Sequence, residues 1–390
     1  MSDTLKQSAS VAAGAALAIL AGAACAAPGC TDAAPRLDDI QIVGTHNSYR
    51  MPFGAHERQI FEAINGASLT MATDYRPRPL AEQLDAGVRS IELDLWPDPQ
   101  GDAYGDPLIR HLIDAAGLSQ DRALAPFEPP ATDFKVLHRK DEDYASHCRT
   151  FRACLAQLGQ WSARHPGHEP VIVFIEAKRP QPPVAAIREQ PAWRAAPTFD
   201  AARVRAIDTA ILDTLPATKL ITPAQLLGRH ANLREAALAG GWPTLAQARG
   251  RFAFVLFEER DLVRDGVRSP ASYYLDGVDW RRAAMFVAAN DARAPYAAFV
   301  KAGDEDYDDE QVRALVAQGF IVRRLADEHT REAHSGTTAR RERALASGAQ
   351  IVITDFYWPE PDFGHHYQVR LPGGSAWRPS PGRPCAGRGG

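Results

Sequence analysis

Short apolar runs alternate with longer amphipathic stretches along most of this sequence. Eight of the runs are rich in Val, Ile, Leu and Phe and are bounded by polar or turn-forming residues, as buried strands are. We predict strands at Ile40–Val43, Ser90–Leu95, Lys135–His138, Val171–Ile175, Arg251–Phe257, Ala284–Val287, Gly319–Arg323 and Gln350–Thr354.

The stretches between these runs have helical spacing and capping residues. Thr150 is placed to cap a helix that carries Phe151, Leu155 and Leu158 on one face. Further helices are expected at Ala201–Leu212, Asp308–Ala317 and Thr338–Ser347. Eight strands alternating with helices predict an α/β protein with a parallel (β/α)8, or TIM, barrel in a single domain. A doubly wound open sheet is the alternative. The proline-rich segments Ala125–Asp133 and Pro180–Pro197 are irregular connections rather than domain boundaries.

Composition fits an ordinary globular protein and narrows the function. The chain has 390 residues, of which 24% are charged and 45% hydrophobic. The net charge of −4 provides no overall basic field for nucleic acid. Residues 1–26 are typical of a signal peptide, with Lys6, an apolar run and small residues ending in Ala24-Cys25-Ala26. We therefore expect residues 27–390 to form one secreted or periplasmic domain, without a transmembrane segment; a lipid anchor on Cys25 is the alternative.

The cysteines agree with export. Removal of Cys25 leaves an even number of cysteines, which favours disulfides in an oxidising compartment. Cys148 and Cys154 are close in sequence, so we pair them, which leaves Cys30 with Cys385. Free buried cysteines are the alternative.

The first strand ends in a cluster of polar groups. Ile42-Val43-Gly44 is followed directly by His46, Asn47 and Ser48. An apolar strand that ends in polar side chains is how a barrel delivers chemistry to its carboxyl-terminal mouth. The structural alternative is a strand that runs into an ordinary turn with a surface histidine.

Two more strands bring carboxylates to the same end. Ser90–Leu95 alternates strictly, so Glu92 and Asp94 share the face opposite its apolar residues. Val171–Ile175 continues into Glu176 and Lys178, which also share a face. An edge strand with a solvated acidic face, or a salt-bridged strand exit, is the alternative.

These residues predict a calcium site beside two imidazoles. Asn47, Glu92, Asp94 and Glu176 offer hard oxygen ligands without the Cys or His spacing of a zinc site, which favours Ca²⁺. His46 follows a predicted strand and His138 ends another, and both can transfer protons or stabilise a transition state.

Taken together, these motifs resemble the catalytic half of phosphatidylinositol-specific phospholipase C, in its secreted, calcium-dependent bacterial branch. The resemblance rests on motifs that occur in the same order and extends from about Leu37 to Tyr367. They include His46-Asn47-Ser48-Tyr49, Glu92-Leu93-Asp94-Leu95-Trp96, His138, Glu176, and the stretches 81–89, 146–148, 165–170 and 344–350.

The resemblance implies a distorted barrel that cleaves phosphatidylinositol at a membrane surface between glycerol and phosphate. His46 resembles the general acid for the diacylglycerol oxygen, and His138 the stabiliser of the phosphoryl oxygens. The four oxygen donors resemble calcium ligands, with Glu92 or Asp94 also taking the proton of the inositol 2-hydroxyl.

Lys178, Arg323 and Tyr357 are the candidate substrate contacts. The chain departs from the family at Arg323-Arg324-Leu325, where a Thr-Arg pair is expected, so the resemblance does not fix the head-group preference. Asp355 and Tyr357 close the eighth strand, where they either line the site or serve as a cap and a rim residue. The alternative functions are a glycerophosphodiester phosphodiesterase and a catalytically silent phospholipid-binding module.

Overall fold

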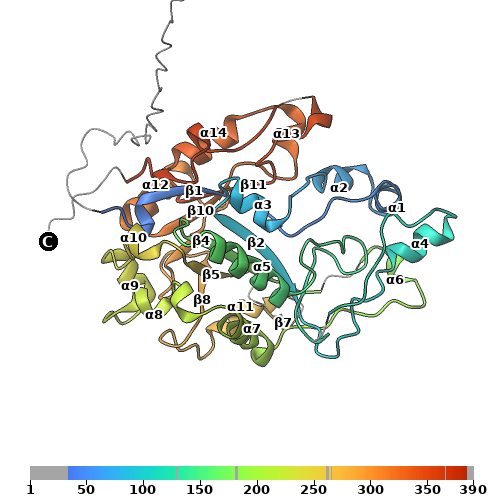
Figure 1. Ribbon diagram of the computed structural model, residues 1–390, viewed down its shortest axis with the longest axis horizontal. Coiled ribbons are helices and arrows are strands. Elements are labelled where there is room, and N and C mark those ends of the chain that lie inside the picture. The colour runs from blue at the N-terminus through green and yellow to red at the C-terminus, as the bar shows by residue number, and fades with distance from the viewer. Residues whose placement is uncertain are drawn as a thin grey trace, which may run out of the picture.

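Eight parallel strands close into a ring at the centre of the molecule (Figure 1). The structure is a computed structural model that describes residues 34–128, 131–180, 183–260, 263–264, 266–364 and 366–383. The signal peptide and the Cys30–Cys385 pair predicted from the sequence lie outside these residues. The strands of the ring are β1 (Ile40–Thr45), β2 (Ser90–Trp96), β4 (Val171–Ala177), β5 (Phe252–Phe257), β8 (Met285–Ala289), β9 (Phe299–Lys301), β10 (Ile321–Leu325) and β11 (Ile351–Thr354).

The predicted barrel is confirmed, but one of its strands was assigned wrongly. The predicted strand at Lys135–His138 is the two-residue β3 (Lys135–Val136), which pairs antiparallel with the end of β2 and lies outside the ring. The sixth strand of the ring is β9, which the sequence pattern did not reveal because it has only three residues. Short strands also form at β12 (Arg378–Pro379), against β1, and in a hairpin of β6 (Val263–Arg264) and β7 (Val267–Arg268).

Helices surround the ring. The expected helix cap at Thr150 is observed, because Thr150 accepts a hydrogen bond from the Ala153 amide; Asp308 caps another helix by accepting one from the Gln311 amide. The helices are α1 (Ala55–Asn65), α2 (Ala67–Ala72), α3 (Leu80–Asp85), α4 (Ile109–Ala115), α5 (Phe151–Arg164), α6 (Ala185–Arg188), α7 (Ala201–Thr214), α8 (Pro223–Leu227), α9 (Leu233–Leu238), α10 (Leu245–Ala248), α11 (Pro270–Leu275), α12 (Asp309–Gln318), α13 (Arg331–Ser335) and α14 (Ala339–Ala346). None of the described helices is long and apolar enough to cross a membrane.

Alternate residues of β4 and β5 belong to two different apolar clusters. Ile91 and Leu93 of β2 point outward and belong to the cluster packed against the surrounding helices. Phe174 of β4 points to the other face and belongs to a second cluster, which also includes residues of α8, α9, α10 and α12. Because Glu92 lies opposite Phe174 in register, it faces the interior, and Asp94 follows two residues later on the same face.

The ring closes through a narrow seam between β1 and β2. These strands pair only at Gly44 and Ser90, and a Cβ atom on Gly44 would lie 2.5 Å from the Ser90 Cβ atom. Beyond this point Ser48 replaces the strand. Its amide donates to the Glu92 carbonyl over 3.0 Å, and its hydroxyl accepts from the Glu92 amide over 2.8 Å. These two hydrogen bonds close the seam on the carboxyl-terminal side of the Gly44–Ser90 pair.

The irregular connections on this carboxyl-terminal side hold α1, α2, α4 and α6, which Figure 1 shows together beside the barrel. The predicted disulfide between Cys148 and Cys154 is present, with Cα atoms 5.1 Å apart. It closes the turn that leads into α5.

Candidate active site

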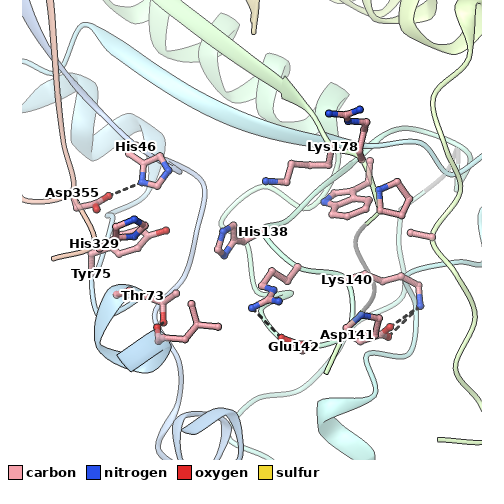
Figure 2. Close-up of a pocket in the computed structure, with 18 of the residues that line it drawn as sticks. His46, Thr73, Tyr75, His138, Lys140, Asp141, Glu142, Lys178, His329 and Asp355 are labelled. Carbon is pink, nitrogen blue, oxygen red and sulfur yellow. Dashed lines mark hydrogen bonds and ion pairs between the residues drawn. The ribbon is translucent and has the colours of Figure 1, made fainter. Parts of the chain in front are cut away.

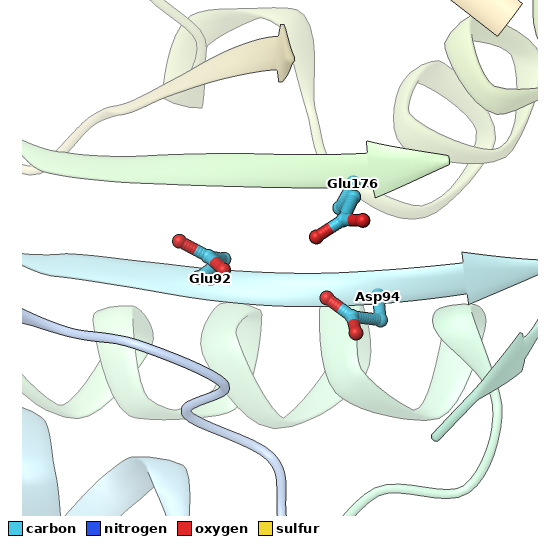
Figure 3. A group of neighbouring side chains, drawn as sticks. All are labelled: Glu92, Asp94 and Glu176. Atoms are coloured by element: carbon cyan, nitrogen blue, oxygen red, sulfur yellow. The ribbon is translucent and has the colours of Figure 1, made fainter. Parts of the chain in front are cut away.

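Three carboxylates from β2 and β4 lie close together (Figure 3). Asp94 lies opposite Glu176 in register, and Glu92 precedes Asp94 by one strand repeat. One oxygen from each carboxylate lies within 4.8 Å of the others. Glu92 and Asp94 are buried. Three anions held this close, with little water, require a cation or protons.

The structure supplies two cations from its own side chains. The Lys178 ammonium lies 3.1 Å from an Asp94 oxygen and 2.9 Å from a Glu176 oxygen. From the opposite side of the barrel, the buried Arg323 guanidinium binds Glu92. Burial raises the pKa of Asp94 to about 7 although Lys178 opposes this change. At Glu176 burial acts in the same direction, but the ion pair with Lys178 outweighs it and lowers the pKa.

This donor set fits calcium. Calcium prefers carboxylate and amide oxygens, and each of the three carboxylates offers one. Oδ1 of Asp94 is buried and accepts no hydrogen bond from the described residues. A buried acceptor without a donor is the kind of atom that a metal ion satisfies.

Asn47 is held firmly beside this group. Its backbone has a φ of 43°, a left-handed conformation that Asn tolerates better than most residues. Its amide nitrogen donates to the Tyr75 hydroxyl over 2.7 Å, and the Tyr49 hydroxyl donates to its oxygen over 3.4 Å. These two contacts fix the orientation of the carboxamide. Its place as the fourth ligand remains a prediction.

His46 is oriented by carboxylates on both sides. Nδ1 lies 2.9 Å from Oδ1 of Asp355, the residue directly after β11, and Nε2 lies 3.6 Å from Oε1 of Glu92. Burial alone would lower the pKa of His46, but Asp355 and Glu92 raise it to about 9. A pKa above neutral favours the protonated imidazole, the form that can donate a proton.

His138 has a similar but separate partner. Its Nδ1 lies 2.9 Å from Oδ2 of Asp143, and the same oxygen accepts from Nε of the buried Arg50 over 2.6 Å. Burial would raise the pKa of Asp143, but Arg50 and His138 lower it to about 2. The pKa of His138 is lowered by burial despite Asp143. The sequence placed His138 at a barrel strand end, which was wrong. It follows β3, and a tight turn between Arg139 and Asp143 brings its partner back to it.

Four of these residues, His46, His138, Lys178 and Asp355, line one pocket of about 710 Å³ (Figure 2). His46 and Asp355 are on one wall, Lys178 is on the other, and His138 lies between them. Leu69, Ala72 and Trp193 add apolar surface to the lining. A pocket of this size with a few convergent polar groups can hold a small ligand or a lipid head group.

Two candidate substrate residues are engaged elsewhere. Arg323 does not line this pocket, because its side chain is buried against Glu92. Tyr357 is also outside the lining; its hydroxyl donates to the Ala86 carbonyl over 2.7 Å. Lys178 does line the pocket. Direct substrate contact by Arg323 or Tyr357 would require these side chains to leave their present partners.

The sequence did not reveal the groups that orient the histidines. Asp355 was predicted either to line the site or to act as a cap; it lines the pocket, but its contact with His46, 309 positions away, was not predicted. Asp143 and Arg50 were not identified. The signals were local but unspecific: Asp143 ends the acidic run Asp141-Glu142-Asp143, and Arg50 directly follows the polar cluster after β1.

The class of protein follows from the groups at the mouth of this TIM barrel. They are acidic oxygens, two oriented imidazoles and a basic side chain. Such a site suits phosphodiester cleavage, in which a metal balances charge while imidazoles transfer protons. Structural comparison agrees on the fold. A calcium-dependent phosphoinositol-specific phospholipase C from Pseudomonas sp. superposes with a TM-score of 0.50 at 17% identity, covering 88% of this chain and 95% of its own. The calcium-dependent phosphatidylinositol-specific enzyme from Streptomyces antibioticus gives 0.53 at 18% identity, covering 89% and 100%.

Residues 35–381 match the family model for Ca²⁺-dependent phosphoinositide phospholipase C. The chain belongs to this family and is a phosphoric diester hydrolase with calcium as its cofactor. Comparison with curated proteins gave no significant match.

Proposed function

We propose that this enzyme cleaves phosphatidylinositol at a membrane surface into diacylglycerol and a cyclic inositol phosphate. The supporting observation is the pairing of two differently tuned imidazoles at one pocket. His46 carries a raised pKa and His138 a lowered one, and each is fixed by its own carboxylate. Groups with separated pKa values at one site are typical of acid and base roles.

Glu92, Asp94 and Glu176, with Asn47, would hold the calcium ion. When bound, calcium supplies positive charge to the phosphate oxygens and lowers the pKa of a bound hydroxyl. Asp94, whose pKa is raised by burial to about 7, is suited to accept the proton of the inositol 2-hydroxyl; Glu92 is the other candidate.

The 2-hydroxyl oxygen then attacks phosphorus, and the bond from phosphorus to the glycerol oxygen breaks. His46 gives its Nε2 proton to that oxygen, so diacylglycerol leaves neutral. His138 faces the phosphoryl oxygens, and their negative charge favours its protonated, donating form. Water opens the cyclic product if the same steps run in reverse.

Incubation of the mature protein with phosphatidylinositol liposomes, followed by phosphorus NMR of the soluble products, tests the proposal. We expect cyclic inositol phosphate in calcium and none in a chelator. Glycerol 3-phosphate would instead identify a glycerophosphodiester phosphodiesterase. Binding to liposomes without any product would indicate a silent lipid-binding module.

The proposal includes export, because an enzyme with this disulfide suits an oxidising compartment. We expect the mature chain to start at residue 27 and to occur in the periplasm or the medium. The N-terminal mass of the protein recovered from each fraction tests this. Recovery of the full-length chain in the cytoplasm would refute it.

A further inference from the structure

Lys178 is placed where a metal ion would have to be. Its ammonium bridges Asp94 and Glu176, two of the three carboxylates that form the oxygen cluster, at 3.1 and 2.9 Å. The side chain is 18% exposed and borders the pocket. It is thus both a counter-ion of the cluster and part of the substrate-facing wall.

Arg323, the second cation at the cluster, is less free to move than Lys178. The Arg323 guanidinium lies inside the barrel over the rings of Phe174 and Phe257, with centroids 5.3 and 4.8 Å away, and it is bound to Glu92. It has no route to the pocket without disturbing the core. Lys178 has a flexible four-carbon stem and open space beside it.

A divalent ion and the Lys178 ammonium cannot share these oxygens cheaply. Like charges a few ångströms apart repel strongly in a site with little water. Asp94 is buried and cannot move away, because its strand is bonded on both sides. Lys178 is the side chain that can move away from these carboxylates.

The backbone limits where Lys178 can go. Its amide donates to the Leu95 carbonyl over 2.9 Å, so the main chain stays attached to β2. The rest of the side chain faces the pocket that also contains His46 and His138 (Figure 2). A displaced ammonium therefore enters the space where the substrate phosphate binds.

We propose that Lys178 competes with calcium for Asp94 and Glu176, and that metal binding turns its ammonium into the pocket as a phosphate ligand. This inference rests on the calcium site of the proposed function. It couples the two events: calcium binding releases the cation that the phosphate needs, and without calcium the same cation keeps the carboxylates neutralised.

Calcium titration calorimetry of the whole mature protein tests the competition. Lys178→Met removes the competing charge and keeps the stem, so we expect about tenfold tighter calcium binding. Lys140→Met is the matched control, because Lys140 borders the same pocket but pairs with Asp141 outside the cluster. Its calcium affinity should equal that of the wild type. Unchanged or weaker affinity in Lys178→Met would overturn the proposal.

Lysine acetylation, followed by peptide mass spectrometry, tests the movement. An ammonium between two carboxylates is protected, so we expect the acetylation rate of Lys178 to rise several-fold with calcium while that of Lys140 stays constant. Tighter binding in Lys178→Met with no calcium effect on Lys178 acetylation would mean that the ammonium only repels the ion from a fixed place, which refutes displacement. If the wild type bound no calcium at all, the metal site itself, and with it the proposed function, would fail.

Discussion

The buried pair of Arg50 and Asp143 supports the strongest prediction about stability and catalysis together. Arg50 is 0% and Asp143 1% exposed, and Nε and Oδ2 are 2.6 Å apart. Asp143→Asn removes the negative charge and leaves a buried guanidinium unpaired. Breaking a buried pair in this way costs about 3–5 kcal/mol of the free energy of unfolding. Because the same oxygen binds Nδ1 of His138, the change also releases that imidazole.

Two measurements separate these effects. Urea unfolding gives the loss of stability, and kcat on phosphatidylinositol, under conditions where the variant is folded, gives the catalytic loss, expected at about 10²–10⁴-fold. Asp98→Asn is the control, since Asp98 and Lys135 form an equally buried pair, 2.9 Å apart, that does not contact either histidine. This control should lose similar stability and keep its kcat. A fall of less than about 1 kcal/mol in the free energy of unfolding of Asp143→Asn would refute the assigned energetic role of the pair. An equal fall in kcat for both variants would refute the role of Asp143 in positioning His138.

Three further outcomes are expected. Asp355→Asn removes a main cause of the raised His46 pKa, so the alkaline limb of the kcat/KM profile, near pH 9 in the wild type, should move to lower pH; an unmoved limb would assign it to another group. The Asp143 pKa is about 2 when folded and about 3.9 when unfolded, so its stabilisation of about 2–3 kcal/mol is complete above about pH 5 and is lost progressively as the pH falls from there to below 2. Acid titration of the unfolding free energy should therefore be steeper for the wild type than for Asp143→Asn, and parallel curves would contradict this. Calcium at 100 times its Kd should stabilise the protein by about 2.7 kcal/mol in thermal unfolding, an effect that Asp94→Asn should largely abolish.

The sequence was informative wherever a strand alternates clearly. Ser90–Trp96 showed both its apolar face and its inward carboxylates, and the structure has the same arrangement. The three residues of β9 are too few for a period, and they owe their place in the ring to pairing with β8 and β10. Lys135–Val136 has the composition of a strand, but it pairs antiparallel with the end of β2 and therefore lies outside the ring. Pairing is decided by tertiary contacts that local patterns do not contain.

The site follows the same division. His46, Glu92, Asp94 and Glu176 could be predicted because each follows or lies within a strong strand, and parallel strands bring their ends together. The residues that orient these groups and shift their pKa values could not be predicted from the sequence. Asp355 reaches His46 across 309 residues, and a surface carboxylate would have had the same sequence signature.

The seam between β1 and β2 is a place where the wall of this barrel can deform. Elsewhere in the ring, neighbouring strands share two to six residue pairs, but here Gly44 and Ser90 form one pair, and Ser48 completes the contact through its amide and its hydroxyl. Small separations of the two strands would therefore break few bonds, and amide exchange should be faster at this join than in β4 or β5. His46 and Glu92 are attached to opposite sides of it, so the spacing between acid and metal ligand can adjust to different ligands while the remaining ladder stays intact.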